Sequence, residues 1–107
     1  MSALSIEGQM RTYELVMVMP PTLDDQQVAA VVDQVRNFVL ERQGEVIKVD
    51  HWGRRRLAYP IDRHREGIYV LAQFRLSPTY VSQLERRLDI SEEVMRHLLV
   101  RMLEDEE

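Results

Sequence analysis

A run of arginines marks the segment of this chain whose side chains are best suited to chemistry. Six basic and two acidic residues lie between Lys48 and Arg65, and three of the basic residues are consecutive: Arg54, Arg55 and Arg56. Guanidinium groups bind phosphate through paired hydrogen bonds and stack on planar bases. The segment therefore predicts a basic surface for a phosphate-bearing partner. A solvated hairpin is the alternative explanation of the same charges.

The rest of the 107-residue chain is acidic. It carries eight basic and sixteen acidic residues, and the formal net charge of the whole chain is −4. This balance argues against a protein that binds nucleic acid on all of its sides. The chain has no cysteine, which excludes disulfides, thiolate-ligated metals and thiol catalysis. We therefore expect one basic edge on an otherwise acidic body.

No spacing of residues typical of an enzyme is present. The four glycines do not match a nucleotide-binding loop. The three histidines, His51, His64 and His97, lie in different predicted elements and form no sequence motif of metal ligands. We therefore predict no catalytic residue, no metal, no cofactor and no small-molecule substrate.

The sequence shows neither a signal peptide nor a segment that could span a membrane. The first ten residues lack a basic start and an apolar stretch, and the longest apolar runs fall far short of the roughly 20 residues that span a bilayer. We expect a flexible N-terminal extension over 1–9, one domain over 10–103 and an acidic tail over 104–107. A cytoplasmic protein with no membrane contact is the corresponding expectation.

The hydrophobic periodicity alternates between that of strands and that of helices. Apolar residues two apart are typical of strands, and apolar residues three and four apart are typical of helices. Thr22 is the expected cap of the first helix and Gly44 its expected end. The predicted elements are a strand over 12–19, a helix between Thr22 and Gly44, a strand over 45–61, a turn over 62–67, a strand over 68–76, a helix starting at Ser77–Pro78 and a strand within 94–103.

This order of elements predicts an α+β, ferredoxin-like βαββαβ fold. Right-handed crossovers between the strands then give a four-stranded antiparallel sheet with both helices on one face. The fold serves enzymes, RNA binders and regulatory modules alike, so it does not define a function. Trp52 stands beside Gly53, where a bulge is expected, and it either packs under the hairpin or stacks on a partner.

The segment GRRRLAYPI at 53–61 resembles the family of bacterial small-subunit ribosomal protein six. The segments MRTYE at 10–14 and GIY at 67–69 also match, and the resemblance extends over about 10–102. It implies the βαββαβ fold and a structural component of the small ribosomal subunit. It further implies that the chain binds the central domain of small-subunit ribosomal RNA together with small-subunit ribosomal protein eighteen.

The resemblance also implies which residues contact RNA or the partner protein. They are the basic and aromatic residues that match the family's pattern: Arg11, Tyr13, Arg54, Arg55, Arg56, Tyr59 and Arg96. Core packing is the alternative for Tyr13 and Tyr59, and pairing with an acid is the alternative for Arg96. Successive residues of a strand point to opposite faces, so we expect Arg54 and Arg56 to share one face and Arg55 to occupy the other.

Two other functions are compatible with the same strand order. An autonomous RNA-recognition protein would carry a basic residue, a glycine and spaced aromatic residues on its third strand, and the segment EGIYV at 66–70 lacks the leading basic residue and the aromatic spacing. A small-molecule-sensing regulatory dimer would leave the arginine run unexplained.

Overall fold

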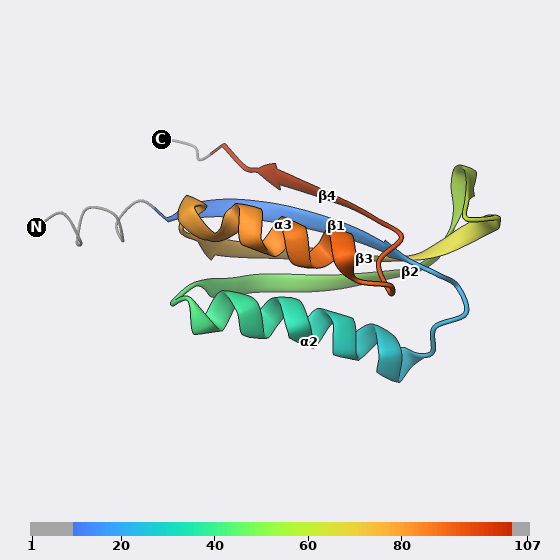
Figure 1. Cartoon of the computed structure of the whole chain (residues 1–107), viewed down its shortest axis with the longest axis horizontal. Helices are drawn as coiled ribbons and strands as arrows, with labels where there is room; N and C mark the ends of the chain where they lie inside the picture. The colour runs from blue at the N-terminus through green and yellow to red at the C-terminus, as the bar shows by residue number, and fades with distance from the viewer. Residues whose placement is uncertain (1–9, 104–107) are drawn as a thin grey trace, which may run out of the picture.

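The computed structural model describes residues 10–103, so the expected extension over 1–9 and the acidic tail over 104–107 lie outside the described residues. The chain forms strands, helices and one short 3-10 segment in an alternating order (Figure 1). These elements are β1 Arg11–Met19, α2 Asp25–Glu41, β2 Glu45–Ile61, β3 His64–Leu76, η1 Pro78–Tyr80, α3 Val81–Ile90 and β4 Arg96–Arg101.

The four strands form one antiparallel sheet in the order β2-β3-β1-β4. Both helices pack on the same face of this sheet, and the other face has no helix on it (Figure 1). The predicted ferredoxin-like arrangement is therefore confirmed. We call the face without helices the open face.

The core lies between the sheet and the helices. On β1, Leu15, Met17 and Met19 are completely buried, and they alternate with residues that point toward the open face. The predicted apolar stripe of α2 is buried against them: Val28, Val31, Val32, Val35, Phe38 and Val39. Burial of each such side chain stabilises the fold by about 1.5–3 kcal/mol, so this contact is what holds α2 against the sheet.

The start of α2 differs from the sequence-based expectation. Asp24 rather than Thr22 is the N-cap, because its carboxylate accepts a hydrogen bond of 2.8 Å from the backbone N–H of Gln27. The side chain of Gln27 accepts one of 2.9 Å from the backbone N–H of Asp24 in return. This reciprocal capping box satisfies two amides that the helix leaves unpaired. Thr22 lies before the cap and is exposed.

The β2–β3 hairpin has a shorter turn than expected. Only Asp62 and Arg63 form it, with φ values of 48° and 70°, and β3 begins at His64. A two-residue turn with both φ values positive continues the twist of the two strands without a break. Gly67, expected in the turn, instead lies inside β3, where a Cβ atom would come within 2.5 Å of Cγ1 of Val18. A glycine is needed there for close packing rather than for the turn.

The hairpin extends beyond the body of the protein. Strand β2 is 17 residues long and β3 is 13, and their far ends project past the helices and bend away from the main sheet direction (Figure 1). The pairing of the two strands shifts at Val46/Lys48, at His51/Gly53 and between Arg56 and Ile61. Such bulges bend a strand and redirect its side chains. We call residues 52–65 the distal hairpin.

No helix in the described part of the chain is long and apolar enough to cross a membrane.

Candidate nucleic-acid interface

The three consecutive arginines lie on the distal hairpin, on an edge strand of the sheet. In the register with β3, Arg54 is opposite Ile68, Arg55 opposite Gly67 and Arg56 opposite Glu66. Directly opposed residues share a face, and Ile68 packs against the core. Arg54 and Arg56 therefore lie on the helix side and Arg55 on the open side, so the arginine run presents positive charge in two directions.

Trp52 anchors the open side of the distal hairpin. It sits at the bulge between His51 and Gly53, and its ring stacks on that of Tyr69 with centroids 6.2 Å apart and an interplanar angle of 16°. The Trp52 side chain remains 42% exposed. The guanidinium of Arg55 lies 5.6 Å from the Trp52 ring, and its Nε donates to the Trp52 carbonyl oxygen at 3.5 Å. Trp52 thus packs on the hairpin and still offers surface to a partner.

The helix-side arginines are held only loosely. Arg54 approaches Glu66 at 3.9 Å, and both side chains are more than half exposed. An exposed ion pair of this kind contributes about 0–1 kcal/mol, so it competes weakly with an incoming phosphate. Within the described residues, Arg56 forms no ion pair, and it lines a shallow groove with Tyr59 and Arg65. Both guanidiniums are available to an anion.

Tyr59 and Arg96 meet across the open face. Nη1 of Arg96 donates a hydrogen bond of 2.7 Å to the hydroxyl oxygen of Tyr59, and the guanidinium carbon lies 5.3 Å from the Tyr59 ring. Arg96 is on β4, so this contact joins the distal hairpin to the far edge of the sheet. Tyr59 is 56% exposed, so core packing does not describe its position. The observed partner of Arg96 is a hydroxyl group rather than an acid.

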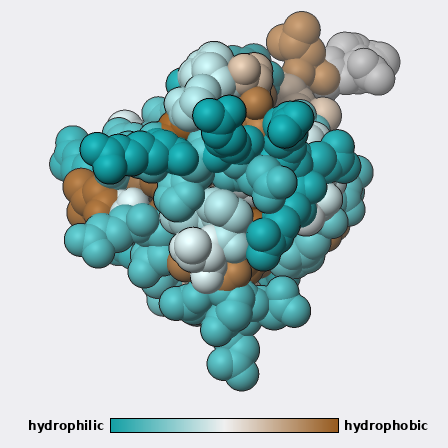
Figure 2. All heavy atoms as spheres, turned by 90° about the vertical axis from the view of Figure 1, so that its right-hand side faces the viewer, coloured by the Kyte–Doolittle hydropathy of each residue, from teal (hydrophilic) through white to brown (hydrophobic). Residues whose placement is uncertain are grey.

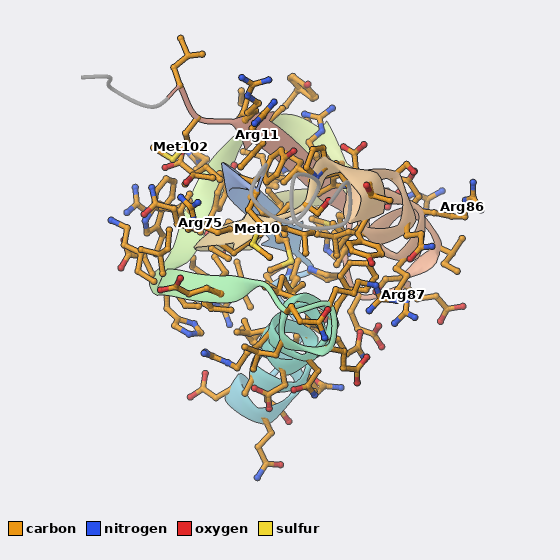
Figure 3. The ribbon with its side chains drawn as sticks, turned by 90° about the vertical axis from the view of Figure 1, so that its left-hand side faces the viewer. Met10, Arg11, Arg75, Arg86, Arg87 and Met102 are labelled. Atoms are coloured by element: carbon orange, nitrogen blue, oxygen red, sulfur yellow. The ribbon has the colours of Figure 1, made fainter. Side chains whose placement is uncertain are left out.

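The remaining two predicted site residues lie elsewhere. Tyr13 is 6% exposed, and its ring lies 6.0 Å from that of Phe74 in the core. Core packing, the alternative given for Tyr13, therefore describes its position: the odd-numbered residues of β1 face the helices, and Tyr13 is one of them. Arg11 begins β1 at the end of the molecule away from the distal hairpin, close to Arg75 (Figure 3).

The open face carries apolar side chains beside the distal hairpin. Val16 lies between Leu71 on β3 and Leu98 on β4 in the strand register. Leu98 and Val100 are 61% and 45% exposed. Viewed from the end where the hairpin lies, by contrast, the surface is mostly hydrophilic (Figure 2). A partner that covered this site would meet both apolar surface and guanidinium groups.

The structure also brings together three arginines that the sequence analysis did not connect. Arg42, directly after α2, faces Arg86 and Arg87 of α3 across a groove. The sequence shows that Arg86 and Arg87 are adjacent, but no local pattern indicates that they lie near Arg42. The expectation of a single basic edge is therefore incomplete. In the described part of the chain, no three His, Asp or Glu side chains gather where a metal ion would fit.

Several known proteins of similar sequence are proteins of the small ribosomal subunit. The family model described as Ribosomal protein S6 matches residues 12–101. The small ribosomal subunit protein bS6 of Mycolicibacterium paratuberculosis is 46% identical over 92 residues, which cover 86% of this chain and 96% of that protein. The proteins of the same name from Moorella thermoacetica and Desulforamulus reducens are 41% and 39% identical, over 90% and 86% of this chain and 98% and 97% of their own lengths.

A solved structure gives the same result for the fold. The crystal structure of 30S ribosomal protein S6 from Thermotoga maritima superposes with a TM-score of 0.81 at 27% sequence identity, covering 88% of this chain and 89% of that one. Sequence and structure agree over nearly the whole described chain. The chain therefore belongs to the ribosomal protein S6 family, whose members are structural, non-enzymatic proteins of the small ribosomal subunit.

Proposed function

We propose that this chain binds the central domain of small-subunit ribosomal RNA together with small-subunit ribosomal protein eighteen, and that the distal hairpin is the main contact. The observation that carries the proposal is the arginine run on an extended edge strand, with an exposed Trp52 and Tyr59 on the same hairpin. Guanidiniums supply phosphate contacts and the rings supply stacking or packing surface.

The two sides of the hairpin contact different partners, the helix side RNA and the open side the partner protein. Arg54 and Arg56 point to the helix side, where only the weak Arg54–Glu66 pair restrains them, and they contact RNA phosphates. Arg55 and Trp52 point to the open side, next to the apolar residues of the sheet, and they contact the partner protein. The outer edge of β2 adds unpaired backbone groups that a partner segment can bind.

Electrostatics explains why a partner protein is needed. The formal charge of −4 repels RNA at long range, so the arginine run alone binds it weakly. A partner with basic groups of its own completes the positive surface. Because each neutralised phosphate releases counterions, the affinity of the joint complex falls steeply with salt, with a slope of about −0.9 per phosphate contact.

A filter-binding titration tests the proposal. The central-domain RNA fragment is titrated with this chain, with protein eighteen and with both, at two salt concentrations. We expect tight, salt-sensitive binding only with both proteins. Equal binding without the partner would instead support an autonomous RNA binder, and binding in none of the mixtures would contradict the proposal.

A double variant locates the contact. Arg55→Ala/Arg56→Ala should weaken the joint complex and leave the thermal unfolding midpoint close to that of the unsubstituted chain, because both side chains are exposed. Arg36→Ala/Arg101→Ala removes the same charge elsewhere and serves as the matched control. A large loss of thermal stability in the first variant would show that those arginines are structural.

A further inference from the structure

A second set of arginines lies in the helix layer, outside the proposed hairpin interface. Gln83, Arg86, Arg87 and Ile90 are spaced three and four residues apart on α3 and therefore share one face of it. Arg42 faces them from the residue after α2, and the five residues line one groove. We call Arg42, Arg86 and Arg87 the helix-layer arginines. In Figure 3, Arg86 and Arg87 lie at the right of the view and Arg75 lies at the left.

The side chain of Arg42 is held by contacts within the protein itself. Its guanidinium carbon lies 3.7 Å from the centroid of the Phe38 ring, and its side chain is only 19% exposed. Nη1 donates to the carbonyl oxygen of Phe38 at 3.2 Å, and Nη2 donates to Oε1 of Gln83 at 3.4 Å. A guanidinium has five N–H groups, so three remain for a ligand. An arginine that is already ordered loses less side-chain entropy on binding.

The other two guanidiniums complete a positively charged groove. The guanidinium of Arg87 lies 5.1 Å from the same Phe38 ring, so two cations flank one aromatic side chain. Arg86 is exposed and projects outward (Figure 3). Within the described residues, neither Arg86 nor Arg87 forms an ion pair.

The nearby acids leave most of the positive charge of this groove uncompensated. Glu41 forms an ion pair of 3.7 Å with Nη1 of Arg42, but the Glu41 side chain is 71% exposed, so the pair is weak. Glu85 and Asp89 are on the same helix, and they point instead toward His97 on β4, at 3.7 Å and 3.6 Å. The acidic side chains of α3 therefore face the sheet edge, and its arginines face the groove with Arg42.

We propose that the helix-layer arginines are a second binding site for the phosphate backbone of RNA. This inference rests on the proposed function and extends it, because it assigns RNA contact to a surface at the end of α2 that lies far from the hairpin tip (Figure 1). All three cations are arginines, whose planar fork matches two phosphate oxygens. The five residues that line the groove include no aromatic side chain for base stacking, so the groove contacts the backbone and carries no sequence preference.

Nuclear magnetic resonance with a generic RNA tests this site directly. The ¹⁵N-labelled full chain is titrated at low salt with a short RNA duplex of mixed sequence, without protein eighteen. We expect chemical-shift changes at the amides of Arg42, Gln83 and Arg87, in addition to changes on the distal hairpin. Shift changes confined to the hairpin would overturn the proposal.

Matched variants then separate charge from structure. Arg86→Gln/Arg87→Gln should abolish the changes at Arg42 and Gln83, leave the hairpin changes in place, and make the slope of log affinity against log salt shallower by about 2. Arg86→Lys/Arg87→Lys should restore most of that slope, and Arg36→Gln/Arg101→Gln should leave it unchanged. A slope in the first variant equal to that of the unsubstituted chain would overturn the proposal.

Two further outcomes separate this site from its alternatives. A polyglutamate peptide that shifts the same signals as strongly as the duplex would overturn the RNA assignment in favour of an acidic protein partner. If the joint complex with protein eighteen fails to form but the duplex still shifts the signals of Arg42 and Gln83, the proposed hairpin function fails and the helix-layer site stands.

Discussion

The hydroxyl of Tyr59 accepts a 2.7 Å hydrogen bond from Nη1 of Arg96, and this contact joins the distal hairpin to β4 across the open face of the sheet. The two residues are 37 positions apart, on strands at opposite edges of the sheet order. The hairpin is therefore not a free arm. The hydrogen bond connects a residue near the hairpin tip to the last strand, on the same hairpin that carries the arginines at positions 54–56.

Removing the hydrogen bond between Tyr59 and Arg96 should make the hairpin more mobile without unfolding the protein. Tyr59→Phe deletes only the hydroxyl, and because the contact is exposed we expect the free energy of unfolding to fall by less than about 1 kcal/mol. Amide hydrogen exchange should accelerate at residues 57–65 and remain unchanged in α2. Tyr80→Phe is the control, since the described structure gives that hydroxyl no hydrogen bond. Unchanged exchange in the hairpin would show that the contact does not restrain it.

Gly67 should not tolerate even a methyl group. A Cβ atom there would lie 2.5 Å from Cγ1 of Val18 and 3.4 Å from the carbonyl oxygen of Met19. Gly67→Ala should therefore lower the free energy of unfolding by about 1–3 kcal/mol, measured by urea denaturation. In a Val18→Ala background, Gly67→Ala should lower the free energy of unfolding much less, because the Cγ1 methyl group of Val18 that clashes with the new Cβ atom is absent. Additive effects of the two substitutions would contradict this explanation.

Two substitutions test whether Asp24 or Thr22, the cap expected from the sequence, stabilises the start of α2. Asp24→Ala removes the acceptor of the capping box and should destabilise the protein by about 1 kcal/mol. Thr22→Ala should change stability by less than about 0.5 kcal/mol, because Thr22 is exposed and lies before the cap. Thermal unfolding of the two variants side by side measures the difference. An equal loss for both would mean that Thr22 also supports the helix start.

Trp52 offers an intrinsic reporter of the proposed interface. It is the single tryptophan of the chain, it is 42% exposed, and it stacks on Tyr69. Formation of the complex with protein eighteen and RNA should cover the ring and shift its emission to shorter wavelength. Trp52→Phe supplies the matched background signal. A complex that forms by filter binding with no change in emission would place Trp52 outside the interface.

The sequence by itself determined the elements and the position of the basic hairpin. Strand β2 was predicted with the bounds that it has, because alternation, a bulge glycine and Pro60 are all local signals. The arginine run needed no tertiary contact to be noticed, since its members are adjacent. The two-residue turn was missed because Gly67 is also a turn residue, and only its contact with Val18 shows its packing role.

Tertiary structure decided which side chains share a site. Tyr13 is in the core because α2 and α3 cover the face of β1 on which it lies, and the alternation of a strand does not say which face a helix will cover. Arg42 meets Gln83 across 41 residues, and Tyr59 meets Arg96 across 37. Contacts of this kind follow from how helices and strands are packed in space, and local periodicity carries no information about them.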